Sequence, residues 1–104
     1  MKFHRELYVG ESIRNVGKVK WKLKHGAGQI RVFVIAVAAG RDQLEIYHCA
    51  FLQQKYYRKN PPCIVGIAGG YDEALELLQK MVSDIYEKTG DYRLKEYFLK
   101  NERD

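Results

Sequence analysis

The chain has 104 residues, 46% of them hydrophobic, and a formal net charge of +5. This length fits one domain over residues 1–104, and the many aromatic and β-branched residues argue against disorder. No apolar run approaches the roughly 20 residues of a membrane-spanning helix, so we expect no membrane partner. No apolar stretch follows the first residues as in a signal peptide, so we expect a cytoplasmic protein.

Positive charge is concentrated in the first part of the chain. Residues 1–62 contain twelve Lys and Arg and four Asp and Glu, for a sum of +8, whereas residues 63–104 contain six and nine, for −3. A surface that gathers this basic excess is suited to a polyanionic partner.

The N-terminal third predicts one small strand and one ambiguous segment. Residues 5–9 fit an edge strand. In residues 12–25, apolar side chains at three- and four-residue spacing form a helical stripe, with Ser12 as N-cap and Gly26 as C-cap. Residues 18–24 also alternate lysine with apolar residues, as a strand would. The two caps favour the helix, and the strand remains the alternative.

The middle of the chain predicts a hairpin and a short helix. Residues 29–38 and 43–49 are strand-like and are joined by the turn at 40–42, which indicates an antiparallel pair. We place Leu44, Ile46 and His48 on one face of the second strand. Residues 50–60 predict a short helix that Pro61 and Pro62 terminate.

The second half contains the clearest elements. Residues 63–68 form an apolar run bounded by prolines and glycines, which predicts a buried strand. Residues 71–88 show helical periodicity, with acidic residues in the first turn and Gly90 after the last. We expect this helix to bury Leu75, Leu78, Val82 and Ile85. A short helix follows Asp91, and residues 101–104 are expected to fray.

These elements predict a small α+β domain. We expect a three- or four-stranded, mostly antiparallel sheet with helices packed mainly on one face. The predicted order is helix, strand, strand, short helix, strand, long helix and terminal helix.

Two basic segments are the candidate polyanion site. Four alternating lysines in residues 18–24 can contact successive phosphates, although the pattern alone favours a solvated face or an edge strand that lysine protects from aggregation. Residues 55–59 mix cations with tyrosines, a composition that binders of single-stranded nucleic acid use. We expect both segments to share one surface. The predicted binding residues are Lys18, Lys20, Lys22, Lys24, Lys55, Tyr57, Arg58 and Lys59. Trp21 is interpreted as a core anchor rather than a stacking platform.

Other chemistry finds little support in the sequence. Cys49 and Cys63 are expected to be reduced and to bind no metal, because no diagnostic ligand spacing surrounds them. The glycines of residues 66–70 lack the lysine and serine of a phosphate-binding loop and are better explained by tight turning. No nucleophile, base or cofactor motif stands out, so we expect no enzyme and no cofactor.

The sequence therefore favours a non-catalytic domain that binds nucleic acid or another polyanion through its basic half. The alternative is a protein-interaction or homodimerising module with an aromatic contact patch. The residues of that patch would be Trp21, Tyr56, Tyr57, Tyr92, Tyr97 and Phe98.

Overall fold

A computed structural model describes residues 2–26, 31–37, 43–60, 62–90, 93 and 96–98 of the chain. The predicted turn at 40–42, the cap Asp91 and residues 101–104 lie outside these described residues. The elements, in chain order, are β1 (Lys2–Val9), α1 (Val16–His25), β2 (Phe33–Val37), β3 (Leu44–His48), the 3₁₀ helix η1 (Cys49–Gln53), α2 (Lys55–Lys59), β4 (Cys63–Ala68) and α3 (Tyr71–Thr89).

The strands form one four-stranded sheet in the order β1-β4-β2-β3. The pairs β2–β3 and β2–β4 are antiparallel, whereas β1 runs parallel to β4. The α+β class and the mostly antiparallel sheet are therefore confirmed, and so is the hairpin of β2 and β3. The one parallel pair joins the first strand in sequence, β1, which lies at the sheet edge, to the last strand, β4.

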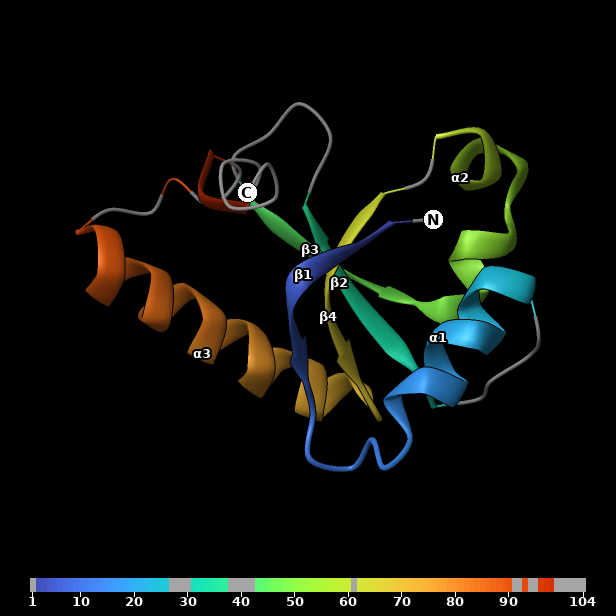
Figure 1. Cartoon of the computed structure of the whole chain (residues 1–104), viewed down its shortest axis with the longest axis horizontal. Helices are drawn as coiled ribbons and strands as arrows, with labels where there is room; N and C mark the ends of the chain where they lie inside the picture. The colour runs from blue at the N-terminus through green and yellow to red at the C-terminus, as the bar shows by residue number, and fades with distance from the viewer. Residues whose placement is uncertain are drawn as a thin grey trace.

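Helices cover both faces of the sheet, whereas the sequence predicts them mainly on one face. Figure 1 shows the sheet between α3 on one side and α1, η1 and α2 on the other. Each face has its own core. Ile35 and Val65 pack with α3, whereas Val34 and Ile64 pack with Leu23 of α1. Neighbouring strand residues point to opposite faces, so buried strands that are apolar on both faces can support two helical layers.

Residues 16–25 form a helix, as the two caps favour. Gly26 ends α1 with a left-handed φ of 70°, and its backbone N–H donates to the carbonyl oxygen of Lys22. The N-cap is Asn15 rather than Ser12, and its side-chain oxygen accepts from the backbone N–H of Lys18 at 3.0 Å. Leu23 is buried, and Val19 packs against the same core. The alternating lysines therefore lie on a helix and not along a strand.

The α3 helix begins and ends where the sequence predicts, but part of its predicted inner face is wrong. Ala74, Leu77, Met81 and Ile85 are buried, whereas Leu75 is 37% exposed. Leu78 and Val82 are half-buried at the edge of this core. The helix is therefore rotated on the sheet relative to the prediction, so that Leu77 takes the place assigned to Leu75.

Glu73 connects the start of α3 to two other segments. Its carboxylate accepts from the backbone N–H of Gly69 at 2.8 Å and from the backbone N–H and hydroxyl of Ser12 at 3.2 and 2.9 Å. These hydrogen bonds, led by the one from Gly69, hold the pKa of Glu73 below its ordinary value. Ser12, predicted as a helix cap, thus binds another element altogether.

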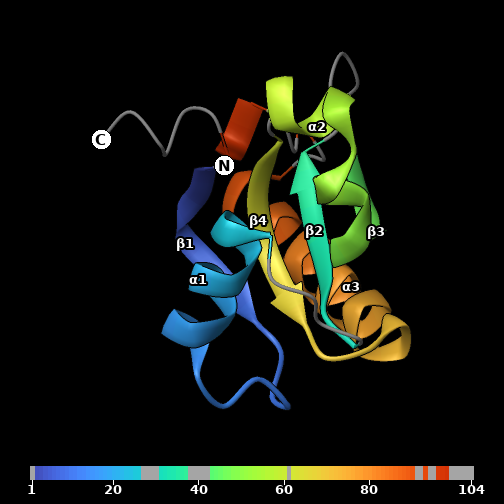
Figure 2. The same cartoon turned by 90° about the vertical axis from the view of Figure 1, so that its right-hand side faces the viewer.

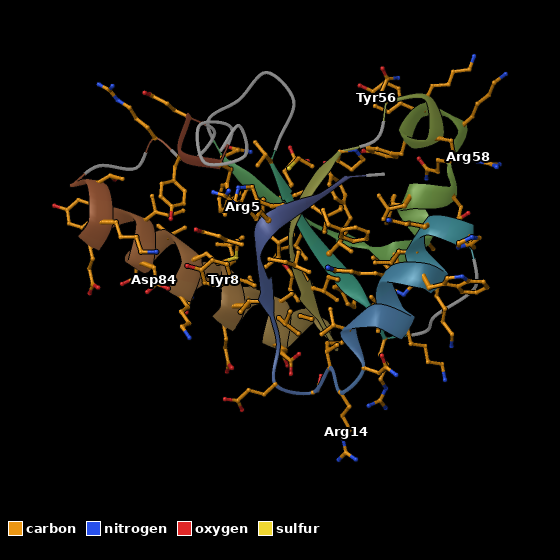
Figure 3. The ribbon with its side chains drawn as sticks, in the orientation of Figure 1. Arg5, Tyr8, Arg14, Tyr56, Arg58 and Asp84 are labelled. Atoms are coloured by element: carbon orange, nitrogen blue, oxygen red, sulfur yellow. The ribbon has the colours of Figure 1, made fainter. Side chains whose placement is uncertain are left out.

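Contacts from α3 and from residues 96–98 hold β1 in place. The hydroxyl of Tyr8 donates to Oδ2 of Asp84 at 2.9 Å, and the two side chains point toward each other in Figure 3. Burial, followed by this hydrogen bond, raises the pKa of Tyr8. Buried His4 donates from Nε2 to the carbonyl oxygen of Phe98 at 3.0 Å and accepts the backbone N–H of Glu6 on Nδ1. Phe98 is itself buried, with its ring edge-on to that of His4.

The segment 50–60 folds as two short helices rather than one. Gln54 has an extended backbone, with φ −66° and ψ 145°, and separates η1 from α2. Leu52 of η1 is buried in the core below α1, and the α2 residues are exposed or half-buried. This break turns α2 outward from the sheet and determines where its cations and tyrosines lie.

Candidate nucleic-acid interface

The two predicted basic segments lie on the same side of the sheet. Figure 2 views this side, with α1 and α2 in front and α3 behind the strands. A cavity of about 230 Å³ joins the end of α1 to η1 and α2. Its lining residues are Lys24, His25, Gly26, Leu52, Gln53, Tyr57 and Arg58. Three of the eight predicted binding residues, Lys24, Tyr57 and Arg58, therefore surround one cavity.

The junction between α1 and η1 is closely fitted. A side chain at Gly26 would collide with the carboxamide of Gln53, whose oxygen lies 2.6 Å from where a Cβ would stand. Gly26 also has a positive φ, which side chains disfavour. The positive φ favours glycine here, whereas the flexible end of Gln53 could move aside; the contact shows that the end of α1 lies close to the last residue of η1.

Trp21 is exposed on α1, so its interpretation as a core anchor is wrong. Its side chain is 57% exposed, and its ring stacks on that of His25 at 4.2 Å between centroids and 19° between planes. Nδ1 of His25 donates to the carbonyl oxygen of Trp21 at 2.8 Å. On the helix, Trp21 lies opposite the stripe that ends in Leu23, because two residues correspond to about 200°. The indole is thus held in place on the solvent side.

The four lysines of α1 divide into two pairs because the segment is a helix. Lys20 and Lys24 place their ammonium groups over the ring of Phe3, at 5.4 and 5.6 Å from its centroid. Lys18 and Lys22 lie on the other side of the helix, since each lies two residues, or about 200°, from a member of the first pair. Lys18 and Lys24 are exposed, and Lys20 and Lys22 are half-buried. The lysines therefore do not form the single strip that a strand over residues 18–24 would present.

The α2 helix adds cations and two tyrosines. Lys55, Arg58 and Lys59 are all exposed, and Figure 3 shows Arg58 pointing away from the sheet. Tyr57 packs its ring against Tyr47 of β3 at 5.5 Å, while neighbouring Tyr56 is 61% exposed. Tyr56 and Tyr57 meet edge to face at 5.1 Å. One tyrosine therefore anchors α2, and the other presents its ring to solvent.

The aromatic contact patch of the alternative hypothesis is not assembled as predicted. Phe98 is 1% exposed and packs with Tyr97 in the core shared with α3. Trp21 and Tyr56 belong to the layer on the opposite face, and Tyr92 lies outside the described residues. The exposed rings of the α1–α2 layer are Trp21, Phe51 and Tyr56.

The two helical layers have opposite charge. The α1 and α2 helices contain seven Lys and Arg residues and no Asp or Glu, whereas α3 contains five acidic residues and two lysines. The formal charge is therefore +7 on α1 and α2 together and −3 on α3. By charge alone, the α1–α2 layer is the side of the sheet that favours an anion.

The glycine-rich turn before α3 is occupied by the protein itself. The backbone N–H of Gly69 is bonded to Glu73, and that carboxylate stands where a phosphate would bind. A cavity of about 220 Å³ beside this turn has Glu11, Glu73 and Glu76 in its lining. Both features disfavour an anion at this end of α3.

The described part of the chain shows no metal-ligand group, no disulfide and no helix long enough to span a membrane. Within it, no group of three or more His, Cys, Asp or Glu residues is placed to hold a metal ion. Cys49 is buried, Cys63 is half-buried, and no disulfide joins them. None of the described helices has the length and apolarity needed to cross a membrane.

Comparisons with known proteins do not point to a function. No family model matches the sequence, and the searches of curated proteins and of solved structures give no significant match. What the site can do therefore follows from its own geometry.

Two residues of this surface escape the sequence prediction. His25 is four positions after Trp21, a spacing that places the two rings together on a helix, so the pair is recognisable once the segment is taken as helical. Gln53 has no comparable signal, because its place at the end of α1 depends on how η1 folds back. Sequence reasoning thus finds the cations and misses the groups that shape the cavity.

Proposed function

We propose that this protein is a non-catalytic nucleic-acid-binding domain that uses the α1–α2 layer. The supporting observation is the convergence of two basic segments, some thirty residues apart in sequence, around one cavity lined by Lys24, Tyr57 and Arg58. Exposed lysines on both helices extend the positive surface beyond the cavity. Cations gathered in this way contact successive phosphates and release their counterions.

The test is the affinity for mixed-sequence RNA and DNA at two salt concentrations. If four cations contact phosphates, affinity falls roughly 50- to 150-fold between about 50 and 200 mM salt. Fluorescence anisotropy of a labelled oligonucleotide measures this fall directly. Absence of binding to both RNA and DNA at the lower salt concentration rejects the proposed function.

A pair of charge-matched variants separates a defined site from net charge. Lys24→Glu with Arg58→Glu removes both cavity cations, whereas Arg14→Glu with Lys80→Glu alters two exposed residues elsewhere. Figure 3 shows Arg14 far from Arg58, and Lys80 belongs to α3 on the opposite face. Each double variant lowers the formal charge from +5 by four. We expect the first to weaken binding and to reduce the salt slope by about two, with little change in the second. Equal losses in both variants contradict a site at the cavity.

The second candidate function is protein interaction or self-association through the same layer. It is favoured by the exposed rings of Trp21, Phe51 and Tyr56, which are 57%, 47% and 61% exposed. Apolar association does not weaken as salt rises, in contrast to polyanion binding. Sedimentation at both salt concentrations distinguishes the two: a dimer that persists at high salt, without nucleic-acid binding, supports this candidate.

A further inference from the structure

The exposed Trp21 ring is an unusual feature of a basic helix that has its own apolar stripe. An exposed tryptophan loses the free energy that burial of its large ring would provide. Here the ring is also restrained, because it stacks on His25 and the His25 imidazole is hydrogen bonded to the Trp21 backbone. An aromatic ring that is both exposed and oriented can accept another flat ring at little entropic cost.

The surroundings of Trp21 match a chain of alternating rings and phosphates. Lys18 lies one turn before Trp21 on the same side of α1, and His25 lies one turn after it. His25 also lines the cavity, where Lys24 and Arg58 supply positive charge. Tyr57 of α2 provides a further ring in the lining of the same cavity. Cationic side chains and aromatic rings therefore alternate along the surface from Lys18 to α2.

The cavity is too small to hold a complete ligand alone. Its volume of about 230 Å³ is below the roughly 300–1,000 Å³ of sites that enclose small molecules. It fits one part of an extended ligand, and its lysine and arginine favour a phosphate. A ligand seated there must continue over the neighbouring surface, which leads past His25 to Trp21.

Building on the proposed function, we infer that the ligand is single-stranded nucleic acid, with one base stacked on Trp21 and an adjacent phosphate at the cavity. Bases within a duplex are stacked on one another, and their faces are closed to side chains except at the ends. Unpaired bases can turn outward and stack on aromatic rings. Stacking is available to every base, so this site reads strandedness and backbone rather than sequence.

Trp21 provides the measurement, because it is the single tryptophan of the chain. Its emission is recorded during titration with a single-stranded oligonucleotide, and with the same sequence within a relaxed closed circular duplex, which has neither ends nor loops. We expect the single strand to quench Trp21 and to bind more tightly than the closed duplex. Equal affinity for both, without quenching, overturns the inference and leaves the proposed function standing. Failure of both to bind rejects the proposed function itself.

Variants test whether the ring itself carries the interaction. We expect Trp21→Ala to weaken single-strand binding about 5- to 100-fold, and Trp21→Phe to recover part of this loss. Tyr86→Ala is the control, because Tyr86 is an aromatic residue of α3 that is 47% exposed on the other layer. Anisotropy of a labelled strand is the readout for all three. A Trp21→Ala affinity equal to that of Tyr86→Ala contradicts stacking on Trp21.

Discussion

Glu73 shows how one side chain can decide a local structure that spans three segments. It holds the turn before α3 through Gly69 and the loop after β1 through Ser12. A carboxylate in the first turn is also favoured by the helix dipole. The same group closes the glycine turn to phosphate, so structural and functional consequences follow from one residue.

We predict that Glu73→Gln lowers the free energy of unfolding by about 0.5–1 kcal/mol near neutral pH, because a neutral amide accepts these hydrogen bonds more weakly and solvent screens the exposed carboxylate. The pKa of Glu73 is lowered in the folded protein from a free value of 4.5. The unfolded chain therefore binds more protons in this range, and the contribution of Glu73 is present above pH 4.5 and is lost as the pH falls through the lowered pKa.

Urea unfolding of both proteins at neutral pH and at about pH 3 measures this difference. The stability gap between the unaltered protein and the Glu73→Gln variant should narrow in acid. A gap that is the same at both pH values would show that the carboxylate charge has no part in it.

At the residue scale, the sequence predicts charge well and exposure less well. The cations of residues 18–24 and 55–59 can be recognised from composition alone. Trp21 cannot be placed, because a large aromatic ring is usually buried, and only its position off the helical stripe of α1 indicates otherwise. Ser12 is likewise a reasonable cap by sequence, but its partner Glu73 is 61 positions away.

At the scale of elements, α3 shows the limit of periodicity. Its pattern predicts a helix over nearly its full length, yet apolar residues extend beyond a single stripe. Leu75, Leu77 and Leu78 all compete for the inner face. Which of them is buried depends on how the helix sits on β4 and β2, and that angle is set by side chains of the sheet. The helix could be predicted from the sequence, whereas its rotation could not.

We predict that Leu77→Ala destabilises the protein by about 2–5 kcal/mol, because Leu77 is 9% exposed in the core beneath α3. Leu75 is 37% exposed, so Leu75→Ala should lower the free energy of unfolding by less than about 1 kcal/mol. Chemical denaturation of the two variants provides the comparison. A larger cost for Leu75→Ala than for Leu77→Ala would mean that α3 packs with the rotation predicted from the sequence.

The α1 segment illustrates a different ambiguity. Alternating lysines fit a strand and a helical stripe fits a helix, and the capping residues favour the helix. The structure bears this out with Asn15 and Gly26 at the two ends. The short segment 50–60 is harder, because the break at Gln54 leaves no proline or glycine signal.

At the scale of the whole molecule, one sheet separates two helical layers of opposite charge. The basic and acidic parts of the sequence thus lie in separate helical layers, one on each face of the sheet. This separation could not be read from the sequence, because the prediction places the helices mainly on one side. It depends on β1 lying beside β4, a pairing of segments some sixty positions apart.

We predict that Phe98→Ala destabilises the whole fold by about 3–5 kcal/mol, because Phe98 is 1% exposed and packs on His4 of β1. Tyr97→Ala serves as the control and should cost less, since Tyr97 is half-buried. Thermal unfolding with hydrogen exchange at the Glu6 amide, which is bonded to His4, measures both effects. If Phe98→Ala costs less than about 1 kcal/mol and leaves the hydrogen-exchange rate of the Glu6 amide unchanged, Phe98 does not anchor β1.

The pairing of Lys2 with Cys63 also has a consequence during synthesis. A ribosome adds about 5–20 residues per second, so roughly 3–12 s pass between the synthesis of β1 and the synthesis of its partner strand β4. The hydrogen bond of His4 forms later still, because its partner Phe98 is 94 positions further along the chain. Throughout this interval the backbone groups of the nascent β1 are bonded only to water and can pair with another chain. Translation speed, and any chaperone that shields β1, should therefore influence the yield of native protein more than the stability of the finished fold does.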